Sequence, residues 1–140
     1  MKKRISVIAA LLSLALLLSS CGAKPLPDGM EEETVGEAGR SIVNLLAAEE
    51  YQTVVDAFHP EFREEYDVTA DKVAEIMDTV SAAGPFVQIE KTLAVGGKSD
   101  NYAGSYASVV VYAVHEESDV IYELSITPDL ALIGLSVKEK

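Results

Sequence analysis

Residues 81–89, Ser-Ala-Ala-Gly-Pro-Phe-Val-Gln-Ile, are the stretch in which the sequence pattern changes from helix to strand. Gly84 and Pro85 mark a helix end, because glycine adopts the backbone conformation found just past a helix and proline cannot continue one. Before this pair, apolar residues recur every three or four positions, and after it they recur every two. Helices first and strands afterwards predict an α+β domain in which the helices cover one face of a sheet.

Three helices are expected before Gly84. The first covers about residues 32–48, and its apolar residues share one face: Val35, Ala38, Ile42, Leu45 and Leu46. A second, short helix covers residues 51–58 and ends at His59-Pro60, because proline disfavours helix in the residue before it. The third helix starts after Thr69, a suitable N-cap, and runs to about Val80. Residues 60–67 between them are expected to form a charged connector.

Four strands are expected after Pro85, at residues 86–95, 102–115, 120–127 and 132–137. In the first strand, alternation places four residues on one face: Val87, Ile89, Leu93 and Val95. Short connections between successive strands predict an antiparallel meander. The fold class expected from the residues is therefore α+β, with N-terminal helices packed on a four-stranded antiparallel sheet.

The N-terminal segment has the order of an export signal. Three cations, Lys2, Lys3 and Arg4, precede an apolar run at residues 5–18 that is shorter than the roughly 20 residues of a membrane span. Leu18-Ser19-Ser20-Cys21 follows and resembles the lipobox of bacterial lipoproteins. The resemblance implies that the Cys21 thiol receives a diacylglyceryl group and that residues 1–20 are removed as a signal peptide. Two acyl chains anchor a protein stably in a membrane.

Three segments follow from this reading. Residues 1–20 are the expected signal peptide, residues 21–33 a lipid-anchored flexible tether rich in proline and glutamate, and residues 34–140 the α+β domain. The expected location is the cell membrane, with the protein anchored at its extracytoplasmic face. Cys21 is the sole cysteine of the chain, so no disulfide can form within it.

The charge of the chain is strongly acidic. The formal net charge is −12, and because three cations lie in the leader, the side chains from Cys21 onward sum to −15. Such a surface repels the phosphates of nucleic acids, so no nucleic-acid partner is expected.

Several core motifs of the domain resemble a known fold family. They are Leu45-Leu46, Glu50-Tyr51-x-x-Val54-Val55-x-x-Phe58, Gly84-x-Phe86, Leu124-x-Ile126 and Ile133-Gly134-Leu135. Over residues 35–137 the chain resembles the nuclear-transport-factor-2-like (cystatin-like) fold, and more narrowly the uncharacterised bacterial DUF 3887 family. The resemblance implies a curved, cone-like sheet wrapped around helices and a possible homodimer. It transfers no catalytic residues.

A search for catalytic and metal-binding motifs finds none. Gly104-Ser105 lacks the second glycine of a serine-hydrolase elbow. His59 and His115 are too few for a zinc site and are expected at the surface or as helix caps. Gly96-Gly97 lacks the lysine of a phosphate loop and is expected to be a turn. No cofactor and no metal are expected.

Two functions remain open. The first is a non-catalytic, lipid-anchored domain that binds a small ligand or an envelope protein, with Tyr51, Tyr112 and Tyr122 as candidate ligand-binding residues. The alternative is a small isomerase- or hydratase-like enzyme with a buried carboxylate, such as Asp56, as general base beside tyrosine hydroxyls. Strand tyrosines are ordinary packing residues, and this favours the first reading.

Overall fold

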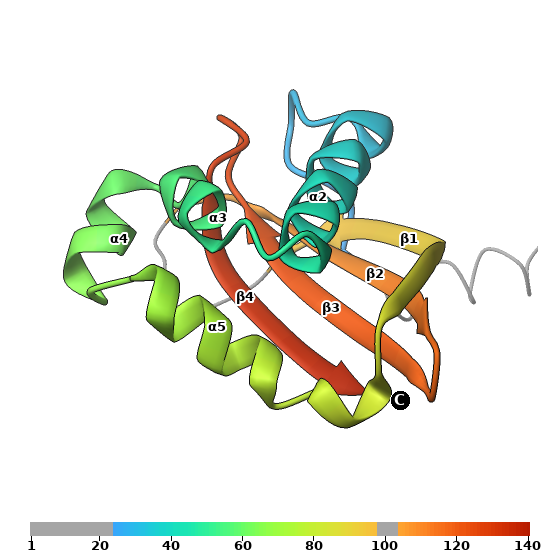
Figure 1. The fold of residues 1–140 in the computed structure, drawn as a ribbon. Coiled ribbons are helices and arrows are strands. Elements are labelled where there is room, and N and C mark those ends of the chain that lie inside the picture. Colours follow the sequence, from blue (N-terminus) through green and yellow to red (C-terminus); the bar gives the residue numbers. More distant parts are fainter. Residues whose placement is uncertain (1–23, 98–103) are drawn as a thin grey trace, which may run out of the picture.

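The computed structural model describes residues 24–97 and 104–140. It confirms the expected α+β class: helices precede four strands and pack on one face of a curved antiparallel sheet (Figure 1). Cys21 and the preceding leader lie outside the described residues, as do residues 98–103.

The helical half contains four α-helices and one short 3₁₀ turn in the described part of the chain. The α-helices are α2 (Glu32–Ala47), α3 (Tyr51–Ala57), α4 (Pro60–Glu65) and α5 (Ala70–Asp78), and the 3₁₀ turn is η1 (Ser81–Ala83). Thr69 caps α5 as expected, its hydroxyl oxygen accepting a hydrogen bond from the Lys72 N–H at 3.2 Å. The prediction of a connector without helix at residues 60–67 is wrong. Pro60 is favourable at the first position of a helix, and α4 begins there.

The sheet is a meander with the order β1-β2-β3-β4. Its strands are β1 (Phe86–Gly96), β2 (Ala107–His115), β3 (Asp119–Ile126) and β4 (Leu132–Glu139). The second strand therefore begins later than expected, since the described residues 104–106 lie outside it.

Two irregularities in β1 change which of its side chains face the helices. The register against β2 shifts between Phe86 and Gln88 and again between Ile89 and Lys91. Each bulge inserts an unpaired residue and inverts the alternation that follows it. The face expected from the sequence is therefore wrong. Ile89 packs against the core, whereas Leu93 is 39% exposed.

The core lies between α2 and the concave face of the sheet. Every second residue of β2 and β3 is buried in it, beginning with Ala107 and Val120 respectively. Gly39 permits a close approach of α2, because a Cβ atom there would lie 2.7 Å from a methyl carbon of Val109. Leu26 and Met30, which precede α2, pack against the same core.

The segment before α2 is joined to the edge of the sheet. Lys24 forms an antiparallel bridge with Gly96, whose N–H donates to the Lys24 carbonyl oxygen at 2.8 Å. Residues 24–31, expected as part of a flexible tether, therefore lie against the domain. Proline at position 25 lacks an N–H and stops further pairing along β1.

Candidate functional site

The three tyrosines expected to line one ligand site do not meet. Tyr122 points from β3 into the core and is fully buried. Tyr112 pairs with Ile121 rather than with Tyr122, so it lies on the opposite face of the sheet, where the Lys91 ammonium sits 5.9 Å from its ring centroid. Tyr51, at the start of α3, is half-buried and lies on the helix side near Tyr122.

Tyr122 belongs to a buried hydrogen-bonded chain. Its hydroxyl lies 2.9 Å from Nε2 of His115, and Nδ1 of His115 lies 2.8 Å from the Gly84 carbonyl oxygen. Because a carbonyl only accepts, Nδ1–H donates to Gly84, and Nε2 of the neutral ring accepts from the tyrosine hydroxyl. The Phe86 ring meets the His115 ring edge-on, with centroids 5.7 Å apart. Both ring nitrogens of His115 are therefore occupied by the protein itself.

Burial raises the pKa of Tyr122 to about 12, and the nearby Tyr51 hydroxyl contributes in the same direction. The pKa of Tyr51 is also raised, first by burial and then by the negative charges of Glu49 and Asp78. These surroundings oppose ionisation of either hydroxyl. Tyr122 is thus kept as a neutral hydrogen-bond donor.

Apolar side chains from the helices and from the inner face of the sheet form the core described above. A small cavity of about 210 Å³ opens beside the His115 ring, and Tyr51, Asp78 and Phe86 also line it. No carboxylate is buried within residues 24–97 and 104–140. Asp56, considered as a general base, has a 64% exposed side chain that lies 3.9 Å from Arg63. The described residues hold no buried general base of the carboxylate type.

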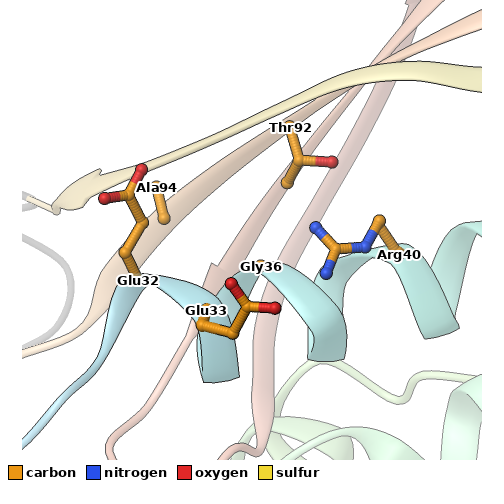
Figure 2. A pocket seen from close by; sticks show the side chains of 6 residues that line it. All are labelled: Glu32, Glu33, Gly36, Arg40, Thr92 and Ala94. Carbon is orange, nitrogen blue, oxygen red and sulfur yellow. The ribbon is translucent and has the colours of Figure 1, made fainter.

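Larger hollows lie along the junction of α2 and β1, and Figure 2 shows the first of them. One of about 390 Å³ is lined by Glu32, Glu33, Gly36 and Arg40 from α2 and by Thr92 and Ala94 from β1. A second of about 490 Å³ continues along α2 and is also lined by Arg40. The two hollows form a groove, hereafter the α2–β1 groove, that runs beside the open edge of the sheet.

Arg40 is the cation of this groove. Gly36, one turn earlier, leaves room for its side chain to fold back, because a Cβ there would lie 3.3 Å from a guanidinium nitrogen. Figure 2 shows the guanidinium on the inner side of α2, with Glu33 one to two turns before it and Thr92 across the gap. Among the described residues the Arg40 guanidinium has no ion-pair or hydrogen-bond partner. Its five N–H donors are available to a ligand.

A third hollow is mainly apolar. It measures about 350 Å³ and lies where α2 and α3 meet the turn between β3 and β4, with Ile42, Leu45 and Leu130 among its lining residues. Leu130 is 45% exposed.

Sequence analysis did not single out Arg40, and it placed His115 at the surface. Arg40 could have been found as the sole cation within the strongly acidic first helix. His115 is 7% exposed, because β2 continues inward alternation to its last residue. His59 does cap a helix as expected, its Nδ1 accepting from the Glu61 N–H at 3.3 Å.

Searches for other kinds of site give negative results over the same residues. No group of three or more His, Cys, Asp or Glu side chains in the described ranges is arranged to hold a metal ion. None of the helices described in residues 24–97 and 104–140 is long and apolar enough to cross a membrane.

Comparisons with known proteins inform the fold alone. No protein-family model matches the chain, and no curated protein does. An NMR structure of a protein from Ruminococcus gnavus is similar, with a TM-score of 0.67, 22% sequence identity, and coverage of 81% of this chain and 96% of that one. The similarity establishes a shared α+β fold.

Proposed function

We propose that this chain is a cell-envelope lipoprotein whose domain binds a ligand without catalysis, in the α2–β1 groove. The ligand carries an anionic group for Arg40 and a cationic group for the neighbouring glutamates, as a short peptide with free termini does. In this proposal the domain is of the nuclear-transport-factor-2-like type, close to the DUF 3887 family.

The anchor is supported by the sequence Leu18-Ser19-Ser20-Cys21 and by the basic and apolar segments before it. Membrane fractions from cells producing the wild-type chain should contain the protein, and mass spectrometry should find Cys21 as a diacylated N-terminal residue. Cys21→Ala should move a folded protein into the soluble fraction. Membrane association that survives this substitution contradicts the anchor.

The single observation that carries the binding site is the unpartnered guanidinium of Arg40 within an acidic groove. An arginine without a partner binds carboxylates through two parallel hydrogen bonds. Glu32 and Glu33 line the same hollow and supply negative charge for an ammonium group. A molecule that carries both charges therefore finds a partner for each of them along the α2 side of the groove.

The absence of catalysis is supported by how the interior groups are used. Both ring nitrogens of His115 are hydrogen-bonded to groups of the protein itself. The raised pKa of Tyr122 keeps its hydroxyl neutral, so this side chain does not act as a base. No observation favours the isomerase- or hydratase-like alternative over a binding role.

Triglycine is a suitable first probe, because its free termini present one ammonium and one carboxylate. Titrated into ¹⁵N-labelled Cys21→Ala protein, it should shift the amide signals of residues 32–40 and 92–94. Arg40→Ala should weaken binding about tenfold or more, as expected for loss of a charge-assisted hydrogen bond. Triglycinamide, which lacks the carboxylate, should bind the wild-type protein as weakly as triglycine binds this variant.

Arg63→Ala is the matched control, since Arg63 is also an arginine on a helix but pairs with Asp56 and lines neither hollow of the groove. It should bind triglycine as the wild type does. Equal binding by Arg40→Ala and the wild type, or signal shifts confined to other residues, contradicts the site.

A further inference from the structure

The segment that leads to the anchor is held by the domain up to Lys24. The Gly96 N–H donates to the Lys24 carbonyl oxygen, and any side chain at position 96 would collide with the Pro25 carbonyl. Leu26 and Met30 then pack against the core. The chain is therefore fixed to the domain from Lys24 onward, and not only from the start of α2.

This attachment leaves a short reach between the domain and Cys21. Three residues span at most about 11 Å when fully extended. The headgroup layer on each side of a bilayer is about 5–8 Å thick. A domain tied to a lipid on Cys21 therefore lies at the level of the headgroups or directly above them, and it cannot move freely away from the membrane.

The pairing of the strands shows which end of the sheet lies beside Lys24, the residue nearest to the proposed anchor. Lys24 pairs with Gly96, Gly96 with Ala107, Ala107 with Ile126, and Ile126 with Leu132, so these residues form one row across the sheet. The turn of residues 127–131 continues directly from the last two members of this row. At about 4.8 Å between neighbouring strands, the row from Lys24 to Leu132 is about 19 Å wide.

This turn presents an apolar side chain to the outside. Leu130 is 45% exposed and has a φ of 64°, an uncommon conformation for a bulky residue. The turn is nevertheless well ordered by hydrogen bonds: the Leu130 N–H donates to the Thr127 carbonyl at 2.8 Å, and the Ala131 N–H donates to the Thr127 hydroxyl at 3.1 Å. The apolar hollow of about 350 Å³ opens beside it.

We infer that this end of the sheet faces the bilayer and that the turn of residues 127–131 contacts the lipid surface through Leu130. The inference rests on the proposed lipid anchor at Cys21. The opposite end, with the β2–β3 turn at residues 116–118, then points into the aqueous phase. The short link to Cys21 brings this end of the sheet to the membrane, and the contact through the exposed Leu130 keeps it there.

The test uses the full lipidated protein in phosphatidylcholine vesicles that contain lipids with a spin label at the headgroup. Since lipid blocks the Cys21 thiol, Asp129→Cys or Glu117→Cys introduces a single site for a fluorescent label at either end of the sheet. The label at 129 should be quenched at least about threefold more than the label at 117, because only the former lies within reach of the headgroup layer.

Leu130→Asp should reduce the quenching at position 129 towards that at position 117. Leu93→Asp is the matched control, because Leu93 is also exposed, at 39%, but lies on the outer face of β1. It should leave the quenching unchanged. Circular dichroism of each variant verifies the fold.

The outcomes separate the two proposals. Equal quenching at both positions in a protein that mass spectrometry shows to be lipidated overturns the orientation and leaves the anchor intact. An unmodified Cys21 and a protein that does not pellet with vesicles overturn the anchor and this inference with it.

Discussion

The two faces of the sheet carry similar residues, but these side chains differ in burial and in the groups they contact. Tyr122 and Tyr112 lie on adjacent strands, yet one is sealed under the helices with its hydroxyl on His115, and the other lies on the outer face beneath Lys91. Val111 and Val110 are neighbours in sequence, and only Val111 is fully buried. The difference teaches that the position relative to α2, and not the residue type, decides what each side chain contributes.

The largest effect is expected from a charge placed on the covered face. Val111→Lys buries an ammonium group without a partner, which costs several kcal/mol against a total stability of about 5–15 kcal/mol. We expect this variant to be largely unfolded by circular dichroism.

Val110→Lys is the matched control for this prediction, because Val110 lies opposite Glu123 on the outer face. Its stability in urea should stay within about 1 kcal/mol of the wild type. Similar losses in both variants would show that the two faces are not distinct.

The loss of stability at high pH should also distinguish the two faces of the sheet, because it depends on Tyr122 on the covered face. The pKa of Tyr122 is about 12 when folded and 10.0 in the unfolded reference. The unfolded chain releases this proton more easily than the folded protein does. The contribution of Tyr122 to the free energy of unfolding is therefore fully present below about pH 10, and it is lost as the pH rises towards 12. The loss is on the order of 2 kcal/mol and should be seen in urea unfolding measured across this range.

Tyr122→Phe should remove that part of the pH dependence, while Tyr112→Phe should retain it. A wild-type stability that does not change across this pH range would refute the assignment to Tyr122.

At neutral pH, removal of the two hydroxyls should have unequal effects. Tyr122→Phe leaves Nε2 of His115 without a partner in a buried place, which costs about 1–3 kcal/mol. Tyr112→Phe should change the free energy of unfolding by less than about 0.5 kcal/mol. Chemical denaturation of both variants measures the two free energies of unfolding. Equal losses of stability would show that the buried hydrogen bonds from Tyr122 through His115 to Gly84 do not stabilise the fold.

The smallest effect is expected on the outer face. Lys91→Ala removes the ammonium that lies 5.9 Å from the Tyr112 ring centroid, an exposed contact worth about 0.5–1 kcal/mol at most. Urea denaturation should detect a shift at the lower end of this range. A loss as large as that of Tyr122→Phe would mean that the outer face is also a stabilising layer.

Local patterns predicted most of the elements, but they missed α4 and placed the faces of β1 wrongly. The spacing of Val35, Ile42 and Leu46 predicted α2, and short connections between strands predicted the antiparallel meander. In β1 the rule of alternation failed, because two bulges shift the pairing with β2 and exchange its faces. A bulge depends on the partner strand, so residues 86–96 alone do not reveal it.

The candidate site was less predictable than the fold. The tyrosines proposed as a group were chosen by residue type, and the sheet places Tyr112 and Tyr122 on opposite faces. The α2–β1 groove depends on how closely one helix approaches one strand, and Gly36 and Thr92 are far apart in the sequence. Such a contact carries no local signal.

The sequence by itself determined the α+β class, the general order of helices before strands, and the lipobox resemblance at Cys21. Each of these depends only on residues that are close together in the chain. Only the tertiary structure decided that Arg40 lies unpartnered in a groove, that His115 is buried against Tyr122, and that Lys24 is fixed to the edge of the sheet. These features arise where segments distant in the chain meet, and packing between such segments depends on the whole fold.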